Sequence, residues 1–215
     1  MRRTCTTTAG PCTTEDTIER EDVSEGRTGL PMRLMFRFVD PDCNPVEGAE
    51  VRIWHTKVDG IYSGETPSGA FCYGDQPESA SEMFFRGSQV TDADGVVAFD
   101  SCFPGWYSSR AIHVHFQVTL ADATWVISQF VWDDALVSEI CASHPDYSAY
   151  GQPDTTSSAD TVFGGTDDLS PYTFEVQRMA DGAMLAYKTV TIQSAGPGCE
   201  AQSGGGPGGG PGGGP

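Results

Sequence analysis

The chain has 215 residues, with 12 Lys and Arg against 30 Asp and Glu, which gives a formal net charge of -18 at pH 7. This length suffices for one sizeable core, so we expect a single folded domain. A surface this acidic repels phosphate backbones, which excludes nucleic acid as a partner. No apolar run in the sequence approaches the roughly 18 residues of a membrane span, which argues against a membrane partner.

Short β patterns separated by turn residues recur along most of the chain. The first runs over residues 32–39 as MRLMFRFV, in which apolar and polar side chains alternate. A turn or short loop rich in Pro, Asp, Asn and Gly joins it to the second pattern, AEVRIWH at 49–55. Further patterns lie at 96–100, 111–120, 125–132, 172–177 and 184–192. Such strands predict an all-β fold, either a barrel or the antiparallel β-sandwich that we favour.

Helical periodicity is confined to DDALVSEICASH at 133–144, where spaced apolar residues predict a short helix. Two long irregular segments, 56–89 and 141–171, interrupt the strands. Loops of that length in a compact domain are commonly functional. We therefore expect a sandwich with long loops around its site and at most short helices.

The seven cysteines stand singly, without the C-x-x-C pairs of zinc ribbons or redox motifs. Disulfides suit some of them better, and an odd number leaves at least one cysteine unpaired within the chain or bonded elsewhere. We expect one disulfide between Cys43, in the turn DPDCNP, and Cys102, before the PGWY corner, because a sandwich could bring these strand ends together. The remaining connectivity stays open.

The first residues, MRRTCTTTAG, are basic but are not followed by the apolar segment of a signal peptide. We expect a secreted or extracytoplasmic protein whose signal peptide has been removed, with a cytoplasmic location left open. The last residues, GPGCEAQSGGGPGGGPGGGP, are too poor in apolar side chains to join a core.

The stretch HVHFQV at 113–118 carries two of the four histidines one residue apart. In a strand, His113 and His115 point to one face while Val114 and Phe116 point to the other. Two such histidines are, by themselves, more often polar side chains on the solvent-exposed face of a sheet than ligands of a metal. Zinc would prefer a third His, Cys or carboxylate, and His144 lies in the predicted helix.

Tyrosines accompany the histidine pair, with Tyr62 in DGIYSG and Tyr107 in PGWYSSRAIHVHF. Together with GLPMRLMFRFVD, PVEGAEVRIWH and FFRGSQVTDADGVVAF, these motifs match in order over roughly residues 15–133. The sequence resembles the intradiol ring-cleavage dioxygenases, the family of catechol and protocatechuate dioxygenases, and most closely their single-domain, secreted-type members. The resemblance implies an N-terminal extension at 1–31, a β-sandwich catalytic domain at 32–193 and a flexible Gly/Pro-rich tail at 194–215.

The resemblance also implies a non-haem Fe(III) held by Tyr62, Tyr107, His113 and His115. Phenolate oxygen is a hard anionic ligand that favours ferric iron, and imidazole completes the site. The implied reaction inserts both atoms of O2 into a catecholic substrate and opens the ring between its two hydroxylated carbons, giving a muconate-type diacid. The implied partners are therefore a small aromatic diol and O2.

Three residues have implied catalytic roles within this resemblance. Tyr107 matches the ligand that leaves the metal and acts as a base, and Arg110 matches an arginine that stabilises negative charge on the substrate. Gln129 matches a glutamine that lines the same pocket. Simple alternation places Arg110 on the face opposite the histidines, so that this role requires an irregular chain at 108–111.

One pocket wall departs from the family pattern, because Gly10-Pro11 is followed by Cys12-Thr13 where aromatic residues are common. We therefore expect that wall, and with it the substrate choice, to differ. We expect core positions rather than pocket-wall positions for three tryptophans, Trp54, Trp106 and Trp132.

Two other functions are weighed against the dioxygenase. One is a non-catalytic β-sandwich binding or adhesion module that retains the metal site. The other is a hydrolase or transferase built on Asp59 and Glu65 beside the tyrosine loop, although neither has a recognisable nucleophile setting. The particular catechol stays open from sequence alone, as does a homo-oligomer.

Overall fold

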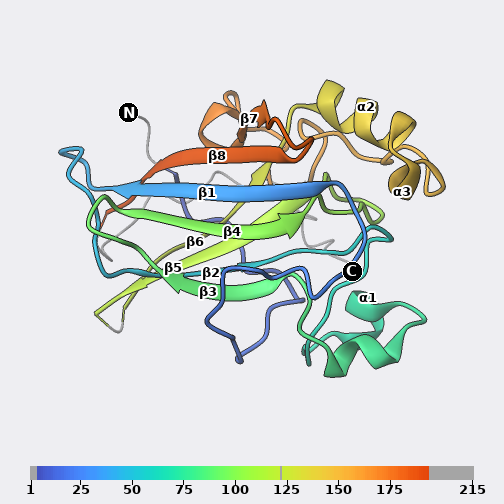
Figure 1. The fold of residues 1–215 in the computed structure, drawn as a ribbon, viewed down its shortest axis with the longest axis horizontal. Helices are drawn as coiled ribbons and strands as arrows, with labels where there is room; N and C mark the ends of the chain where they lie inside the picture. The colour runs from blue at the N-terminus through green and yellow to red at the C-terminus, as the bar shows by residue number, and fades with distance from the viewer. Residues whose placement is uncertain (1–3, 122, 194–215) are drawn as a thin grey trace, which may run out of the picture.

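Two four-stranded sheets pack face to face in the computed structural model, which describes residues 4–121 and 123–193 (Figure 1). The strands are β1 (Pro31–Val39), β2 (Glu50–Trp54), β3 (Arg86–Val90), β4 (Val96–Cys102), β5 (His113–Leu120), β6 (Ala123–Val131), β7 (Glu175–Arg178) and β8 (Met184–Thr191). One sheet has the order β4-β1-β8-β7 and the other the order β3-β2-β5-β6. The predicted all-β sandwich is confirmed.

Neighbouring strands pair antiparallel with one exception, because β1 and β8 run parallel. The helices of the described residues are short, as predicted. They are α1 (Gly69–Tyr73), α2 (Asp134–Ser143), α3 (Pro145–Ser148) and the 3-10 turns η1 (Pro77–Ser81) and η2 (Ser170–Tyr172). None of them has the length and apolar character needed to cross a membrane.

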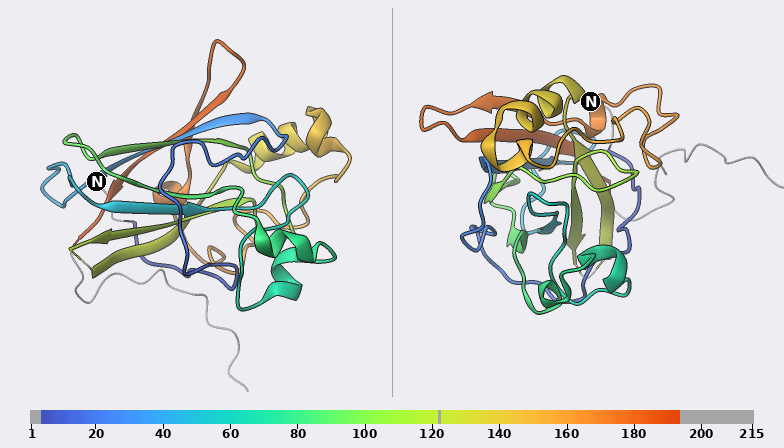
Figure 2. Two further views of the ribbon diagram at one scale, coloured as in Figure 1. Left: turned by 60° about the horizontal axis from the view of Figure 1, so that its bottom comes forward. Right: turned by 90° about the vertical axis from the view of Figure 1, so that its right-hand side faces the viewer.

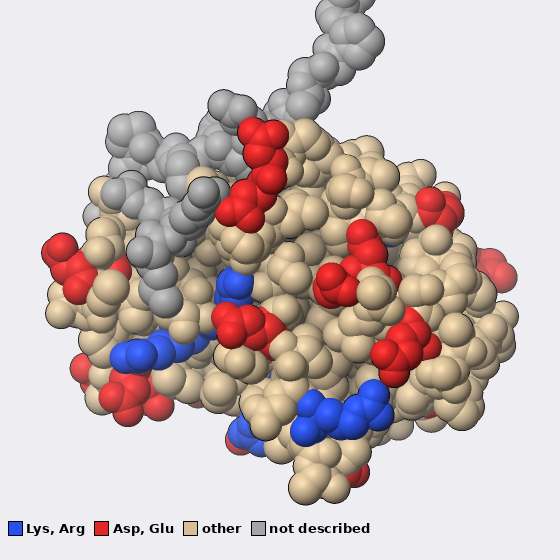
Figure 3. All heavy atoms as spheres, turned by 90° about the horizontal axis from the view of Figure 1, so that it is seen from above, with Lys and Arg blue, Asp and Glu red and all other residues tan. Residues whose placement is uncertain are grey.

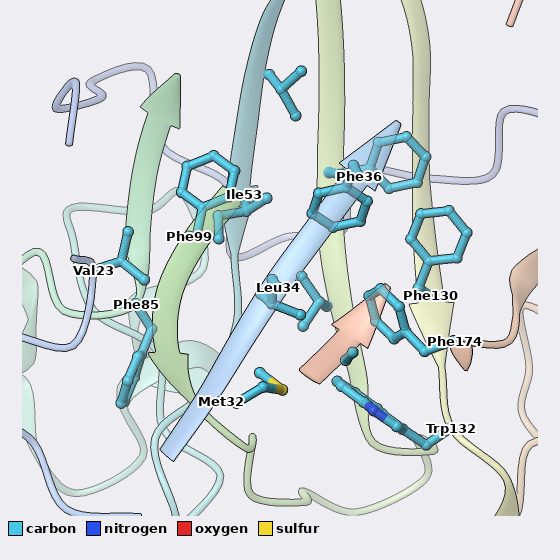
Figure 4. Close-up of a cluster of buried hydrophobic side chains, with 14 of the residues drawn as sticks. Val23, Met32, Leu34, Phe36, Ile53, Phe85, Phe99, Phe130, Trp132 and Phe174 are labelled. Atoms are coloured by element: carbon cyan, nitrogen blue, oxygen red, sulfur yellow. The ribbon is translucent and has the colours of Figure 1, made fainter. Parts of the chain in front are cut away.

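The core lies between the two sheets and is rich in aromatic rings (Figure 4). The alternation in β1 sends Phe36 and Phe38 inward and leaves Arg37 exposed. The ring of Phe36 lies 6.1 Å from that of Phe116 on β5 and 5.8 Å from that of Phe130 on β6. Burying each such ring contributes about 1.5–3 kcal/mol, so the facing strands hold the sandwich closed.

Strand β3 was not predicted, because RGSQV lacks the apolar alternation of a strand. Its one large apolar residue, Val90, is exposed, whereas Arg86 and Ser88 are buried by other parts of the chain. The strand predicted at 172–177 begins later, at Glu175, since η2 precedes it. The strands predicted at 32–39 and 49–55 are joined by a short loop but belong to different sheets.

The predicted Cys43–Cys102 disulfide is wrong, and both thiols are free. Cys102 pairs with Pro31 at the start of β1, whereas Cys43 follows the end of that nine-residue strand. At about 3.3 Å per residue, β1 keeps the two cysteines at opposite ends of the sandwich. A disulfide joins Cys12 to Cys72 instead.

Residues 4–30 pack along the sandwich, and Val23 enters the core. The tail expected at 194–215 lies outside the described residues. The two long segments between strands, which contain α1 and α2 respectively, gather at one end of the sandwich in two views (Figures 1 and 2). Acidic side chains are spread over the face seen in Figure 3, with basic side chains at a few separate places.

Candidate active site

Two glycines bring the tyrosine-bearing segments together, and each lies two residues before its tyrosine. A Cβ on Gly60 would meet the carbonyl oxygen of Trp106 at 2.2 Å, and a Cβ on Gly105 would meet the carbonyl oxygen of Val58 at 2.2 Å. Gly60 also has a φ of 81°, which side-chain-bearing residues rarely adopt. The motifs DGIY and PGWY are therefore two halves of one close backbone contact.

The histidines reach the same place from the beginning of β5. The Nε2 atom of His113 lies 3.2 Å from the Tyr62 Oη, 3.3 Å from the Tyr107 Oη and 3.1 Å from the His115 Nε2. Tyr62 and both histidines are buried, whereas Tyr107 is half-buried. The predicted alternation is confirmed, since Val114 and Phe116 point into the core instead.

The ring of His113 is oriented by its own backbone. Its Nδ1 donates a hydrogen bond to the carbonyl oxygen of Ala111 at 2.6 Å. A carbonyl only accepts, so Nδ1 carries the proton and the Nε2 lone pair points toward the two phenol oxygens and His115. Histidines that bind metals are commonly fixed in this way, by a hydrogen bond at the opposite nitrogen.

Sheet pairing supplies the residues beside His115. Trp54 on β2 and Gln129 on β6 are its direct neighbours across the strands, so all three side chains share one face. The Trp54 and His115 rings are stacked with their centroids 4.9 Å apart. Gln129 is fully buried and its amide donates to the carbonyl of Thr8 at 3.0 Å.

Arg110 lies in the irregular chain before β5, as its predicted role requires, because Ser109 has a φ of 70°. Its guanidinium contacts the Gln129 Oε1 at 2.5 Å and the Tyr107 Oη at 3.4 Å. The Nε donates to the carboxylate of Asp160 at 2.8 Å. Arg110 therefore contacts Tyr107 and Gln129 from a position before the start of β5.

Asp160 is a residue that the sequence did not reveal. Its carboxylate is fully buried and accepts hydrogen bonds from the backbone N–H groups of Ala111 and Val162, at 2.8 and 2.7 Å, besides the Arg110 contact. It lies 50 residues beyond Arg110, in the long segment after α3. Nothing local in that segment marks it, so only the folded chain identifies it.

Arg86 was also missed, although its motif FFRG was noted. It is buried, and no carboxylate among the described residues pairs with it. Its guanidinium donates to the carbonyl oxygens of Ser63 and Cys12. Its charge lies over the ring of Tyr62 at 6.0 Å. These contacts join the tyrosine loop to the N-terminal segment.

The N-terminal segment forms the wall that departs from the family pattern. A Cβ on Gly10 would lie 3.1 Å from the ring of His115, so the backbone here packs on the site itself. Cys12 is bonded to Cys72 in α1, and both are buried. This disulfide ties the N-terminal wall to α1, and the expectation that the wall differs from the family pattern stays a prediction.

Burial keeps the four converging side chains uncharged when no cation is present. It raises the pKa of Tyr62 well above 10, and the nearby Tyr107 raises it further. Burial also lowers the pKa of His113 to about 3 and that of His115 well below 6.5. A bound cation reverses this preference at the tyrosines, because it stabilises phenolate oxygen.

The donor set suits a hard trivalent cation. Two phenol oxygens and two imidazole nitrogens converge, and His113 already presents a lone pair. Among the described residues, no three His, Cys, Asp or Glu side chains gather as a metal-binding group. The metal and catalytic roles of Tyr62, Tyr107, His113, His115, Arg110 and Gln129 stay predictions.

Other candidate residues lie apart from these donors. Asp59 forms an ion pair with Lys57 and accepts from Gln76, whereas Glu65 is exposed. Trp132 belongs to the main core, while the indole of Trp106 donates to the carbonyl of Gly151. Of the three tryptophans, Trp54 is the one whose ring stacks on a candidate ligand, His115.

Two phenols, one buried and one half-buried, converge with two buried imidazoles at one end of this β-sandwich, and such a donor set suits a metal ion. The family model described as Dioxygenase matches residues 7–180, which is most of the chain. The chain belongs to the intradiol ring-cleavage dioxygenase family. This is a family of dioxygenases that act on catecholic substrates with O2.

Three solved structures illustrate the likeness of fold. An intradiol ring-cleavage dioxygenase from Tetranychus urticae is 24% identical, with a TM-score of 0.76 over 89% of this chain and 94% of that one. The dioxygenase domain of a carbohydrate-binding fusion protein from Streptomyces is 18% identical, with a TM-score of 0.64 over 90% and 100%. Hydroxyquinol 1,2-dioxygenase from Pseudomonas putida is 19% identical, with a TM-score of 0.63 over 90% and 67%. No curated protein sequence matches this chain.

Proposed function

We propose that this protein is a non-haem Fe(III) intradiol dioxygenase, which opens a catechol between its two hydroxylated carbons to a muconate-type diacid. The observation that carries the proposal is the convergence of Tyr62, Tyr107 and His115 within 3.3 Å of the His113 Nε2 atom. Membership of the dioxygenase family supports it.

Tyr62, Tyr107, His113 and His115 would hold the iron. When bound there, a ferric ion would supply Lewis-acid binding of the catechol oxygens and activate the ring toward O2 without an external reductant. The two tyrosines provide the negative charge that favours the ferric state. The two histidines need lose no proton, because burial already keeps them neutral.

Tyr107 is the group placed to accept a proton from the substrate. It is half-buried, whereas Tyr62 is buried, so an incoming catechol meets Tyr107 first. Burial raises the pKa of Tyr107, while the Arg110 cation works against that shift. The phenolate oxygen of Tyr107 can therefore take the proton from a catechol hydroxyl, which leaves the substrate oxygen anionic.

Arg110 and Gln129 act on the charge that develops on the substrate ring. The guanidinium is held by the Asp160 carboxylate on one side and by the Gln129 Oε1 on the other, so it is oriented before substrate arrives. A fixed cation in a half-buried site stabilises developing negative charge more strongly than a solvated one. The amide of Gln129 is itself fixed by Thr8.

Oxygen uptake by the iron-loaded protein, measured across a panel of catechols, tests the proposal. We expect uptake without NADH or added ferrous iron, and a product with two carboxyl groups. A ring-opened product with an aldehyde beside the acid would contradict intradiol cleavage. If a full ferric site consumes no catechol at all, the protein is a binding module that retains the metal site.

We also propose a secreted or extracytoplasmic location. The buried Cys12–Cys72 disulfide supports it, because disulfides persist in oxidising compartments and are rare in the cytosol. Fractionation of the native source, with alkylation of free thiols before lysis, tests this location. Reduced Cys12 and Cys72 in a cytoplasmic fraction would contradict it.

A further inference from the structure

The approach to the candidate site is marked by the side chains that keep some exposure. Tyr62, His113, His115 and Gln129 are buried, whereas Tyr107 and Arg110 are half-buried. A substrate that reaches the buried atoms must therefore pass beside Tyr107 and Arg110. We call this approach the entrance. It consists of Tyr107, Arg110 and the solvent-exposed residues in contact with them.

Phe71 on α1 lies at the entrance. Its ring meets that of Tyr107 edge to face, with the centroids 5.8 Å apart and an interplanar angle of 89°. Phe71 is nevertheless 58% exposed, which is the highest value among the exposed large apolar residues of the described chain. Single exposed apolar residues are ordinary on protein surfaces, but this one contacts a candidate catalytic side chain.

The backbone around Phe71 is fixed rather than loose. The next residue, Cys72, is buried and bonded to Cys12. The carbonyl oxygen of Cys72 accepts a hydrogen bond from the N–H of Tyr62 at 3.0 Å. Phe71 is therefore tied both to the N-terminal wall and to the tyrosine loop, and its ring offers an aromatic face in a set position.

Charges at the entrance disfavour an anionic substituent. The Arg110 cation is already paired with Asp160. Next to Tyr107, the carboxylate of Asp154 accepts hydrogen bonds from the Ser108 hydroxyl at 2.7 Å and from the Ser109 N–H at 3.0 Å. A hydrogen bond from the Thr155 hydroxyl, together with those from Ser108 and Ser109, lowers the pKa of Asp154, so a negative charge lies at the rim.

We propose that the substrates are uncharged catechols with an apolar or aromatic substituent, and that this substituent packs on the exposed ring of Phe71. A carboxylated catechol meets the Asp154 carboxylate at the rim, where the Arg110 cation is already paired with Asp160, and binds more weakly than its uncharged counterpart. This inference rests on the proposed dioxygenase function, because it takes the catechol oxygens to be bound at the tyrosines and histidines.

Calorimetric titration of the iron-loaded protein under nitrogen tests the inference without turnover. The probes are catechol, 4-phenylcatechol, 3,4-dihydroxybenzoate and the methyl ester of 3,4-dihydroxybenzoate. We expect 4-phenylcatechol to bind about tenfold more tightly than catechol, from the apolar area that a ring covers on Phe71. The ester should bind more tightly than the acid by a similar factor.

Variants of the exposed ring identify its contribution. In Phe71→Ala the preference for 4-phenylcatechol over catechol should disappear, and Phe71→Tyr should restore it. Met179→Ala, which shortens an exposed apolar side chain in the turn between β7 and β8, is the control and should keep the preference. Thermal unfolding of each variant shows whether the fold is intact.

Three outcomes separate the inference from the proposed function. Equal preference in the wild type and Phe71→Ala would overturn the role of Phe71. Tighter binding of the acid than of its ester would overturn the uncharged substrate class. Neither result would touch the dioxygenase proposal, whereas failure of the iron-loaded protein to bind catechol itself would overturn both.

Discussion

The two long segments that gather at one end of the sandwich contribute different residues to the candidate site. The first, between β2 and β3, carries the candidate ligand Tyr62 and is secured by the Cys12–Cys72 disulfide and the buried Arg86. The second, between β6 and β7, carries no candidate ligand but holds Arg110 through Asp160. Changes in the first segment should therefore affect the metal, and changes in the second should affect the rate alone.

Removing the phenol oxygen of the first segment should have the largest effect. Tyr62→Phe deletes one anionic ligand, so iron affinity should fall by more than about 100-fold. Mutating a residue that only hydrogen-bonds to a metal ligand already lowers metal affinity by about 10–100-fold. The visible absorption that a phenolate gives to Fe(III) should be lost with the metal. Iron content and the absorption spectrum of the purified variant check this expectation.

Tyr150→Phe is the matched control, because Tyr150 is an exposed tyrosine outside the converging set. It should keep iron and colour. An iron-saturated wild type without a visible band would contradict the assignment of the tyrosines. Full iron content in His113→Ala or His115→Ala would contradict the assignment of that histidine as an iron ligand.

Neutralising the carboxylate of the second segment should slow turnover while sparing the metal. Asp160→Asn removes the anion that orients Arg110, and kcat should fall by roughly 10²–10³-fold, as when a preorganised charge or donor is lost. Iron content and colour should match the wild type. Loss of iron in this variant would contradict the expectation that the second segment affects the rate but not metal binding.

Asp134→Asn serves as the control for Asp160. Asp134 lies in the same segment and also accepts a backbone hydrogen bond, from Ser157 at 2.9 Å, but it touches none of the candidate site residues. Its replacement should leave kcat within about threefold of the wild type, as expected for a residue away from the reacting groups. Equal losses in both variants would indicate a general loosening of the segment.

The disulfide should make the first segment the more rigid of the two. It closes a loop with a sequence separation of 60, so the Cys12→Ser, Cys72→Ser double variant should lose up to about 4 kcal/mol of unfolding free energy. Denaturant unfolding measures this loss. Cys43→Ser, which removes an exposed free thiol, should leave the unfolding free energy unchanged.

Acid should lower the unfolding free energy of the protein through His55, which directly follows β2 at the start of the first segment. Burial lowers the pKa of His55 from 6.5 to about 4. Below pH 6.5 the unfolded chain binds a proton that folded His55 does not. The contribution of His55 to stability is therefore fully present above pH 6.5, and about 3 kcal/mol of it is lost as the pH falls to 4.

Unfolding free energies from pH 7 to 5 measure this contribution. The wild type should lose more stability over that range than His55→Asn does. His144→Asn, which changes the capping residue of α3, should keep the wild-type slope. A His55→Asn variant with the wild-type slope would assign the acid sensitivity to other groups.

The sequence was sufficient where a local pattern controls the structure. Alternation predicted β1 and β5, and the faces of His113 and Phe116 followed from it. It failed for β3, because Ser88 is buried by the N-terminal segment, whose Arg20 N–H donates to the Ser88 carbonyl. No repeat within RGSQV can encode contacts made with residues 60 or more positions earlier.

The same contrast holds at the site. Tyr62, Tyr107 and the histidines belong to short motifs, so the resemblance identified them by position. Asp160 and Phe71 lie in irregular segments, where neither periodicity nor a motif marks them. Their importance comes from contacts with Arg110 and Tyr107, 50 and 36 positions away in the chain, which only the folded structure brings about.

The most direct test of the central claim is the fate of labelled dioxygen. Iron-loaded protein should be given catechol under ¹⁸O2, without NADH, and the product identified by mass spectrometry. We predict a muconate-type diacid that carries both labelled oxygen atoms, formed by wild type and absent with Tyr62→Phe. A labelled aldehyde acid, or a diacid whose formation survives loss of both Tyr62 and Tyr107, would contradict the account.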